Sequence, residues 1–128
     1  MEFYLKYALI VFLGGGIGAV TRYWLSGVIY RLTGANFPYG TLVVNVFGCL
    51  LIGFLMTFFE ERFILAPALR LLLTIGFLGG LTTYSTFSYE TIALLQEGNF
   101  LYGLGNIIVT TFVCLSSTWL GAALGKVL

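Results

Sequence analysis

The chain has 128 residues, of which 59% are hydrophobic and 9% charged, and its formal net charge at pH 7 is +1. Soluble domains carry about a quarter charged residues, and nucleic-acid-binding proteins carry basic clusters, so this composition excludes both classes. The chain also has no histidine and no aspartate, which removes the usual parts of zinc sites and Ser-His-Asp triads; we do not expect an enzyme.

Four segments are long and apolar enough to cross a bilayer, which takes about 20 residues each. They cover residues 4–30, 39–59, 67–96 and 100–127, approximately. Pro38 begins the second segment, and charged residues follow it at Glu60 to Arg62. Because the spans leave no room for a soluble domain, residues 1–128 are predicted to form a single all-α, four-helix transmembrane channel domain.

The first segment has the apolar length of a signal peptide, but its apolar run continues beyond Arg22, which favours a retained membrane helix. An even number of spans places both termini on one side. That side holds Lys6, Arg62, Arg70 and Lys126. The other side holds Arg31 and, if its side chain reaches that interface, Arg22, so the bias toward cytoplasmic termini in an inner (plasma) membrane is weak. With so few charges, insertion in both orientations is compatible with the sequence.

Small residues recur four apart in three spans. The pairs are Gly14 with Gly18, Gly76 with Gly80, and Gly121 with Gly125. This spacing is typical of helices that pack closely in lipid. Four short helices enclose little space alone, so a homo-oligomer is expected.

The third span contains the stretch GFLGGLTTYSTFS, rich in glycine and hydroxyl residues. Such residues are poor helix formers, so we expect the helix to break near Gly79 to Thr83, at mid-membrane depth. Carbonyls freed at such a break can bind Na⁺. The alternative is a continuous helix with a hydroxyl-rich packing face. Beyond the break, Tyr84 and Phe87 share one face, and the positive edges of their rings could meet an anion.

Two spans carry polar stripes of residues spaced four apart. The fourth span has Asn106, Thr110, Cys114 and Thr118, and the second has Thr41, Asn45 and Cys49. Such stripes either hold helices together by hydrogen bonds or line a polar path, and the length of the fourth-span stripe favours the path. The two cysteines are expected to be free thiols.

Two charged residues, Arg22 and Glu90, lie well inside spans rather than near their ends. Intramembrane charges usually face protein or a water-filled cavity. Arg22 could also extend to the interface, and Glu90 is equally compatible with an interfacial anchor and a functional carboxylate.

Three motifs, GAVTRY at 18–23, GTLVVNVFG at 40–48 and GFLGGLTTYSTFSYE at 76–90, together resemble the Fluc (CrcB) family of fluoride channels. The match extends over essentially the whole chain. It implies an antiparallel, dual-topology homodimer in the lipid bilayer, with two pores that let fluoride leave the cytoplasm passively. It also implies a structural, non-transported Na⁺ held by the backbone carbonyls of Gly79 and Thr82 from both subunits.

The same resemblance assigns the pore. The paired pore phenylalanines of the family correspond to Tyr84 and Phe87, its asparagine to Asn45 and the arginine of its first helix to Arg22. The polar track of the fourth helix corresponds to Thr110, Cys114 and Thr118, and Ser85 lies within the third motif. The chain departs from the family where Tyr84 replaces phenylalanine and Cys114 replaces a hydroxyl residue.

Two other classes remain as alternatives. A small multidrug-resistance exporter, coupled to protons, also has four spans, but it needs a carboxylate in its first span, which this chain lacks. A non-conducting assembly subunit would explain the glycine pairs but not the polar stripes.

Overall fold

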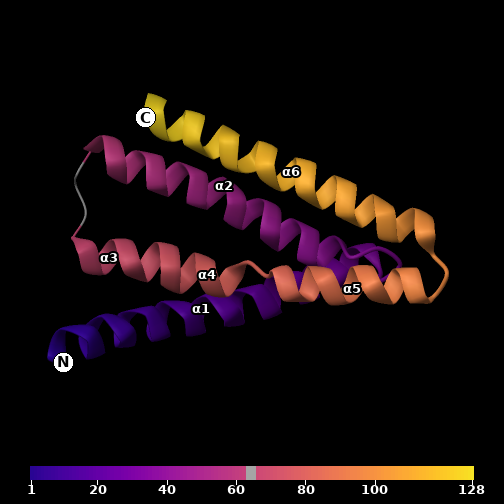
Figure 1. Ribbon diagram of the computed structural model, residues 1–128, viewed down its shortest axis with the longest axis horizontal. Helices are drawn as coiled ribbons and strands as arrows, with labels where there is room; N and C mark the ends of the chain where they lie inside the picture. The colour runs from indigo at the N-terminus through magenta and orange to yellow at the C-terminus, as the bar shows by residue number, and fades with distance from the viewer. Residues whose placement is uncertain (63–65) are drawn as a thin grey trace.

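The computed structural model describes residues 1–62 and 66–128, which form helices joined by short connections. The elements are α1 (Glu2–Thr33), α2 (Tyr39–Arg62), α3 (Pro67–Leu71), the π-helical η1 (Leu72–Leu78), α4 (Gly79–Leu81), α5 (Tyr84–Gln96) and α6 (Phe100–Val127). The two termini lie at the same end of the molecule, where α2 ends and α3 begins (Figure 1).

Within residues 1–62 and 66–128, four helical stretches are long and apolar enough to cross a membrane: Glu2–Thr33, Tyr39–Arg62, Pro67–Gln96 and Phe100–Val127. This confirms the predicted number of spans. The first helix extends slightly beyond the predicted segment at both ends, and the second extends beyond it at its C-terminal end.

Large apolar side chains cover the outside of the molecule. Phe12, Phe112 and Trp119 are 73%, 68% and 75% exposed, whereas the buried apolar core consists of a few side chains such as Val44 and Leu81. Exposed apolar surface of this extent is incompatible with water and suits lipid. The chain is therefore a multi-pass membrane protein.

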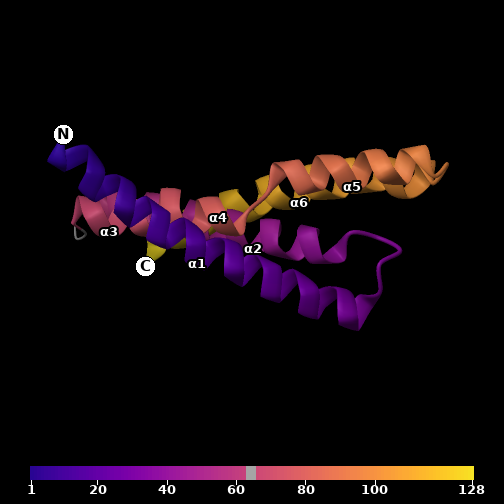
Figure 2. The same cartoon turned by 90° about the horizontal axis from the view of Figure 1, so that it is seen from below.

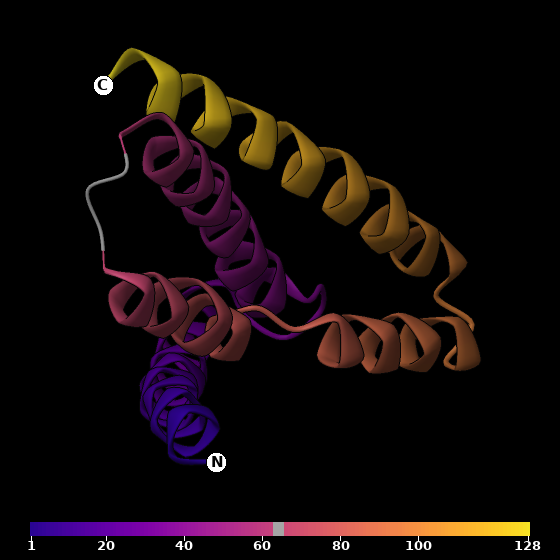
Figure 3. The same ribbon diagram turned by 60° about the vertical axis from the view of Figure 1, so that its left-hand side comes forward.

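The third span is helical from Pro67 to Leu81, with the π-helical turn η1 inside it. Thr82 (φ −86°, ψ 154°) and Thr83 (φ −151°, ψ 118°) are then extended, and α5 begins at Tyr84. This link is visible between α4 and α5 in Figure 3. The extended residues are thus two threonines, while Gly79 and Gly80 at the N-terminal side of the expected interval remain helical.

Glycines bring helix backbones into direct contact, first along α1 and again between α2 and α6. Along α1, a Cβ at Gly18 would overlap the Phe77 carbonyl of η1, and a Cβ at Gly80 of α4 would overlap the Gly15 carbonyl. Figure 2 shows α1 crossing α3 and α4 on this side. The predicted close packing of the Gly14/Gly18 and Gly76/Gly80 pairs is confirmed, because the pair on α1 lies against the pair on the third span.

The second contact joins α2 to α6. A Cβ at Gly53 would overlap the carbonyl of Thr118, and a Cβ at Gly121 would overlap that of Leu50. Gly121 meets Leu50, and one turn later Gly125 meets the carbonyl of Phe54, so the two helices run parallel, as Figure 1 shows. Gly121 therefore packs as its spacing predicts, and Gly53 is its counterpart on α2.

Candidate functional site

A cavity of about 250 Å³ lies between the N-terminal half of α2, the start of α5 and the middle of α6. Its lining residues are Asn45, Cys49, Thr82, Thr83, Tyr84, Phe87, Thr110, Thr111 and Cys114. These side chains supply hydroxyls, thiols, an amide and two aromatic rings, and none of these lining residues is charged. The cavity therefore combines polar groups with an apolar wall and has no fixed charge.

Residues of both polar stripes line this cavity, Asn45 and Cys49 from α2 and Thr110 and Cys114 from α6. Gly53 of α2 meets Thr118 of α6, so one helical turn earlier the parallel helices place Cys49 beside Cys114. Cys49 and Cys114 both line the cavity. The stripes that the sequence predicted on separate spans thus form a single surface.

Asn45 fixes the extended link between α4 and α5. Its Nδ2 donates to the Thr83 carbonyl at 3.0 Å, and its Oδ1 accepts from the Thr83 amide at 2.8 Å. Both backbone groups of Thr83 would otherwise lack a helical partner. Since these bonds occupy Oδ1 and one hydrogen of the amide, Asn45 retains one N–H that can face the cavity.

The Thr83 side chain starts the next helix. Its Oγ1 accepts from the Thr86 amide at 3.1 Å, which is an N-cap for α5. Ser85 lies beside it, with its hydroxyl 3.2 Å from that of Thr83, but it is exposed and outside the lining of the cavity. The polar link is therefore held by its own side chains and by Asn45.

Tyr84 and Phe87 form the aromatic wall. Their ring centroids are 5.4 Å apart and the rings are inclined by 50°. Phe87 is 8% exposed, whereas Tyr84 is 80% exposed. The single chain thus leaves one side of this wall uncovered.

A chain of hydrogen bonds links the α6 stripe to the backbone of Phe87. Thr110 donates to Asn106 Oδ1 at 3.0 Å, Asn106 Nδ2 donates to Thr91 at 2.8 Å, and Thr91 donates to the Phe87 carbonyl at 2.7 Å. Every hydroxyl proton in this chain is already used. Thr110 thus presents an acceptor oxygen to the cavity unless its hydroxyl rotates.

Arg22 bonds to the broken end of the third span rather than to the cavity. Its Nε donates to the Gly80 carbonyl at 3.0 Å, close to the C-terminal end of α4. A cation in that position satisfies a carbonyl that has lost its helical partner and opposes the negative end of the helix dipole. Arg22 and Thr118, like Ser85, lie outside the lining of the cavity.

The carbonyl oxygens of Gly79 and Thr82 flank that arginine contact. Within residues 1–62 and 66–128 neither oxygen accepts a hydrogen bond outside the helices, because Thr83 N bonds to Asn45 and Thr86 N bonds to Thr83 Oγ1. Carbonyl oxygens without hydrogen-bond donors are suitable ligands for a hard cation. The two residues that the resemblance nominates for Na⁺ therefore carry the donor atoms that the ion needs.

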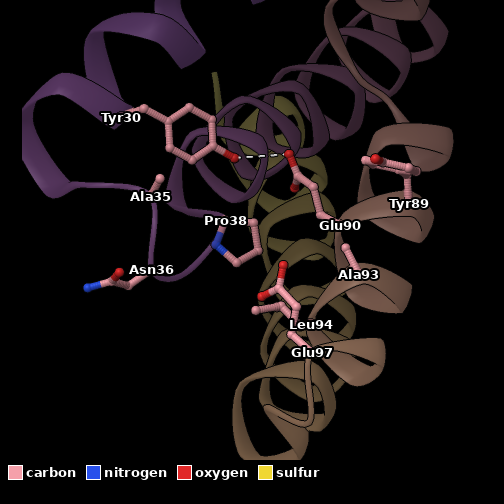
Figure 4. A pocket seen from close by; sticks show the side chains of 9 residues that line it. All are labelled: Tyr30, Ala35, Asn36, Pro38, Tyr89, Glu90, Ala93, Leu94 and Glu97. Carbon is pink, nitrogen blue, oxygen red and sulfur yellow. Dashed lines mark hydrogen bonds between the residues drawn. The ribbon is translucent and has the colours of Figure 1, made fainter.

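A second cavity, of about 270 Å³, surrounds Glu90. Figure 4 shows the Tyr30 hydroxyl pointing at the carboxylate, at 3.1 Å from Oε1, and Thr41 donates to the same oxygen at 2.8 Å. Oε2 is buried and has no partner among the described residues. Glu90 is therefore a part-buried carboxylate whose Oε1 accepts hydrogen bonds from two other helices.

The comparisons with known proteins agree with this arrangement. Residues 9–122 match the family model described as CrcB-like protein, Camphor Resistance (CrcB). This chain belongs to the CrcB family. A protein of Geotalea daltonii named fluoride-specific ion channel FluC is 49% identical over 119 residues, which cover 91% of this chain and 96% of that protein. A protein of Trichlorobacter lovleyi with the same name is 53% identical over 81% of this chain and 83% of its own length.

For this CrcB family member, the structure brings together five of the residues nominated from the sequence. They are Asn45, Tyr84, Phe87, Thr110 and Cys114. Thr111 also lines the cavity, although no spacing pattern points to it, because it lies beside the stripe rather than on it. The Tyr30–Thr41–Glu90 cluster joins three helices and could be found only from the fold.

Proposed function

We propose that this chain is a subunit of a fluoride channel that exports fluoride passively and lowers its cytoplasmic concentration. The observation that carries the proposal is the cavity lined by polar groups and aromatic rings with no charged side chain among its lining residues. The names of relatives with about half their residues identical support the choice of ion.

The chemistry of the cavity suits a small, strongly hydrated anion. A pore must replace the lost water with donors, yet bind weakly enough for the ion to leave. A fixed cation in a narrow path would hold fluoride too tightly. Neutral donors together with the positive edges of aromatic rings avoid that problem.

In this proposal fluoride moves along the surface formed by the two stripes. Asn45 offers its remaining N–H, and Thr110, Cys114 and Thr118 offer donors along α6 after rotation of their side chains. Phe87 and Tyr84 turn ring edges toward the ion. Outside the cavity lining, Ser85 extends the polar link and Arg22 contributes a positive field.

The functional unit in this proposal is an antiparallel, dual-topology homodimer in the inner (plasma) membrane. The 80% exposed ring of Tyr84 on the cavity supports it, because a channel wall has to be closed on all sides. A second copy supplies the missing side, and two copies give two pathways.

The proposal includes a structural Na⁺ at the dimer centre that is not transported. The carbonyls of Gly79 and Thr82, which accept no other hydrogen bond within the described part of the chain, would hold it together with the same atoms of the second copy. The ion would supply positive charge near the pathways without standing in them. Arg22 keeps the neighbouring Gly80 carbonyl bound and so leaves these two oxygens to the cation.

Fluoride release from liposomes tests the function. Purified protein in fluoride-loaded vesicles should release fluoride to an ion-selective electrode, at a rate that does not depend on a proton gradient, while chloride-loaded vesicles release little. Release that requires a proton gradient would favour an exporter of the multidrug type. Equal release of chloride would contradict fluoride specificity.

A further inference from the structure

The two cysteines of the chain lie side by side on parallel helices. Gly53 and Thr118 are in backbone contact, and one turn earlier Cys49 and Cys114 occupy the adjacent layer. Both thiols are free, half-buried and on the wall of the same cavity. The two side chains therefore border the same space from adjacent helices.

The number of ligands limits which metal could bind there. Within residues 1–62 and 66–128 no three His, Cys, Asp or Glu side chains gather around one point, and the chain contains no histidine. Zinc requires about four such ligands, so a pair of thiols does not suit it. Soft d¹⁰ ions such as Cu⁺ and Hg²⁺ prefer sulfur and accept two thiolates in a linear arrangement.

We propose that Cys49 and Cys114 together bind one soft metal ion as a two-thiolate site in the wall of the cavity. On binding, both S–H bonds break, two metal–sulfur bonds form, and two protons leave through the cavity. With a divalent ion the site becomes neutral, and this lowers the cost of burying it among apolar helices.

Mercury titration of the reduced, full-length protein in detergent tests the site. Native mass spectrometry should show a mass gain of one mercury minus two hydrogens per chain, and this adduct should persist in excess monothiol. Cys49→Ser and Cys114→Ser should each weaken retention by about 100-fold or more, since the second thiol no longer acts at high effective concentration. Thr111→Ala, which alters the same wall without removing sulfur, should behave as the parent protein.

Two results would overturn the proposal. One is uptake of two mercury ions per parent chain, each on one thiol. The other is a single-cysteine variant, eluting as the parent does, that retains mercury as strongly as the parent. Alkylation of the parent protein with N-ethylmaleimide should abolish retention and provides a test that needs no substitution. The readout is metal binding, so its result does not depend on whether the chain conducts fluoride.

Discussion

Two hydrogen bonds join the Asn45 side chain to the backbone of Thr83, where the third span is extended. From the sequence, an asparagine at this position could hold either the interruption or a passing ion, and the spacing of the stripe does not decide between them. The geometry assigns most of its hydrogen-bonding capacity to the backbone. This role of Asn45 follows from the approach of α2 to Thr83, which the spacing of residues along one helix does not reveal.

Replacing Asn45 by alanine should therefore destabilise the protein as well as slow transport. The change leaves the amide and carbonyl of Thr83 unpaired, at roughly 1–3 kcal/mol for each buried group. We expect a lower midpoint of thermal unfolding in detergent and a large loss of fluoride release. Thr111→Ala serves as the matched control on the same cavity and should keep the midpoint of unfolding. An Asn45→Ala protein as stable as the parent would show that the two hydrogen bonds to Thr83 are dispensable.

Replacing Phe87 by isoleucine tests the aromatic wall. The side chain is 8% exposed, and isoleucine keeps most of its apolar bulk while removing the ring edge. Fluoride release from liposomes should collapse while the protein still elutes as the parent assembly. Phe112→Ile, at a ring that is 68% exposed on α6, should conduct normally. Unchanged release from the Phe87 variant would remove this residue from the pathway.

At the scale of elements, the glycine contacts explain why the helices can approach so closely. Within lipid, apolar side chains gain little from meeting one another, so small residues at the contact decide which helices pair. Gly53 allows α2 to touch the Thr118 carbonyl of α6, and this contact sets the register that brings the polar stripes together. The function of the cavity thus depends on a residue that does not line it.

Gly53→Ala should force α2 and α6 apart. The added methyl group overlaps backbone, which cannot rotate away, so we expect a loss of about 1–3 kcal/mol in stability. Gly105→Ala on α6, with no atom within 4 Å of the added carbon, should cause no loss and could gain helix propensity. Thermal unfolding of both variants in one detergent gives the comparison, and equal midpoints would contradict the close packing.

Spacing within a helix predicted which residues share a face, but not which helix that face meets. The Gly121 pair was predictable as a packing surface, whereas its contact with Leu50 was not. The π-helical turn η1 was not predicted either, because Leu72–Leu78 contains no residue that a regular helix excludes. Composition predicted an interruption near Gly79 to Thr83. Within that interval Gly80 stays helical, in contact with α1, and Thr82 and Thr83 are the extended residues.

At the scale of the whole molecule, charge is the feature that sets orientation. The start of α1, the ends of α2 and α6 and the start of α3 lie at one end of the molecule (Figure 1). These segments carry Lys6, Arg62, Lys126 and Arg70, whereas Arg31 lies in the last turn of α1. With so few Lys and Arg residues at either end, the orientation of the chain in the membrane is only weakly specified. An antiparallel pair of identical chains requires a weakly specified orientation, since copies must insert both ways round.

Added lysines should therefore separate the two orientations. Glu60→Lys with Glu61→Lys adds positive charge at the end with the termini, whereas Gln96→Lys with Glu97→Lys adds it at the opposite end; all four positions are exposed. If two antiparallel copies form each channel, either variant alone should insert one way and lose most fluoride release. Co-expression of the two variants should restore release, because each supplies one orientation. Full activity of either variant alone, with a single orientation shown by labelling a terminal tag from one side, would contradict the antiparallel dimer.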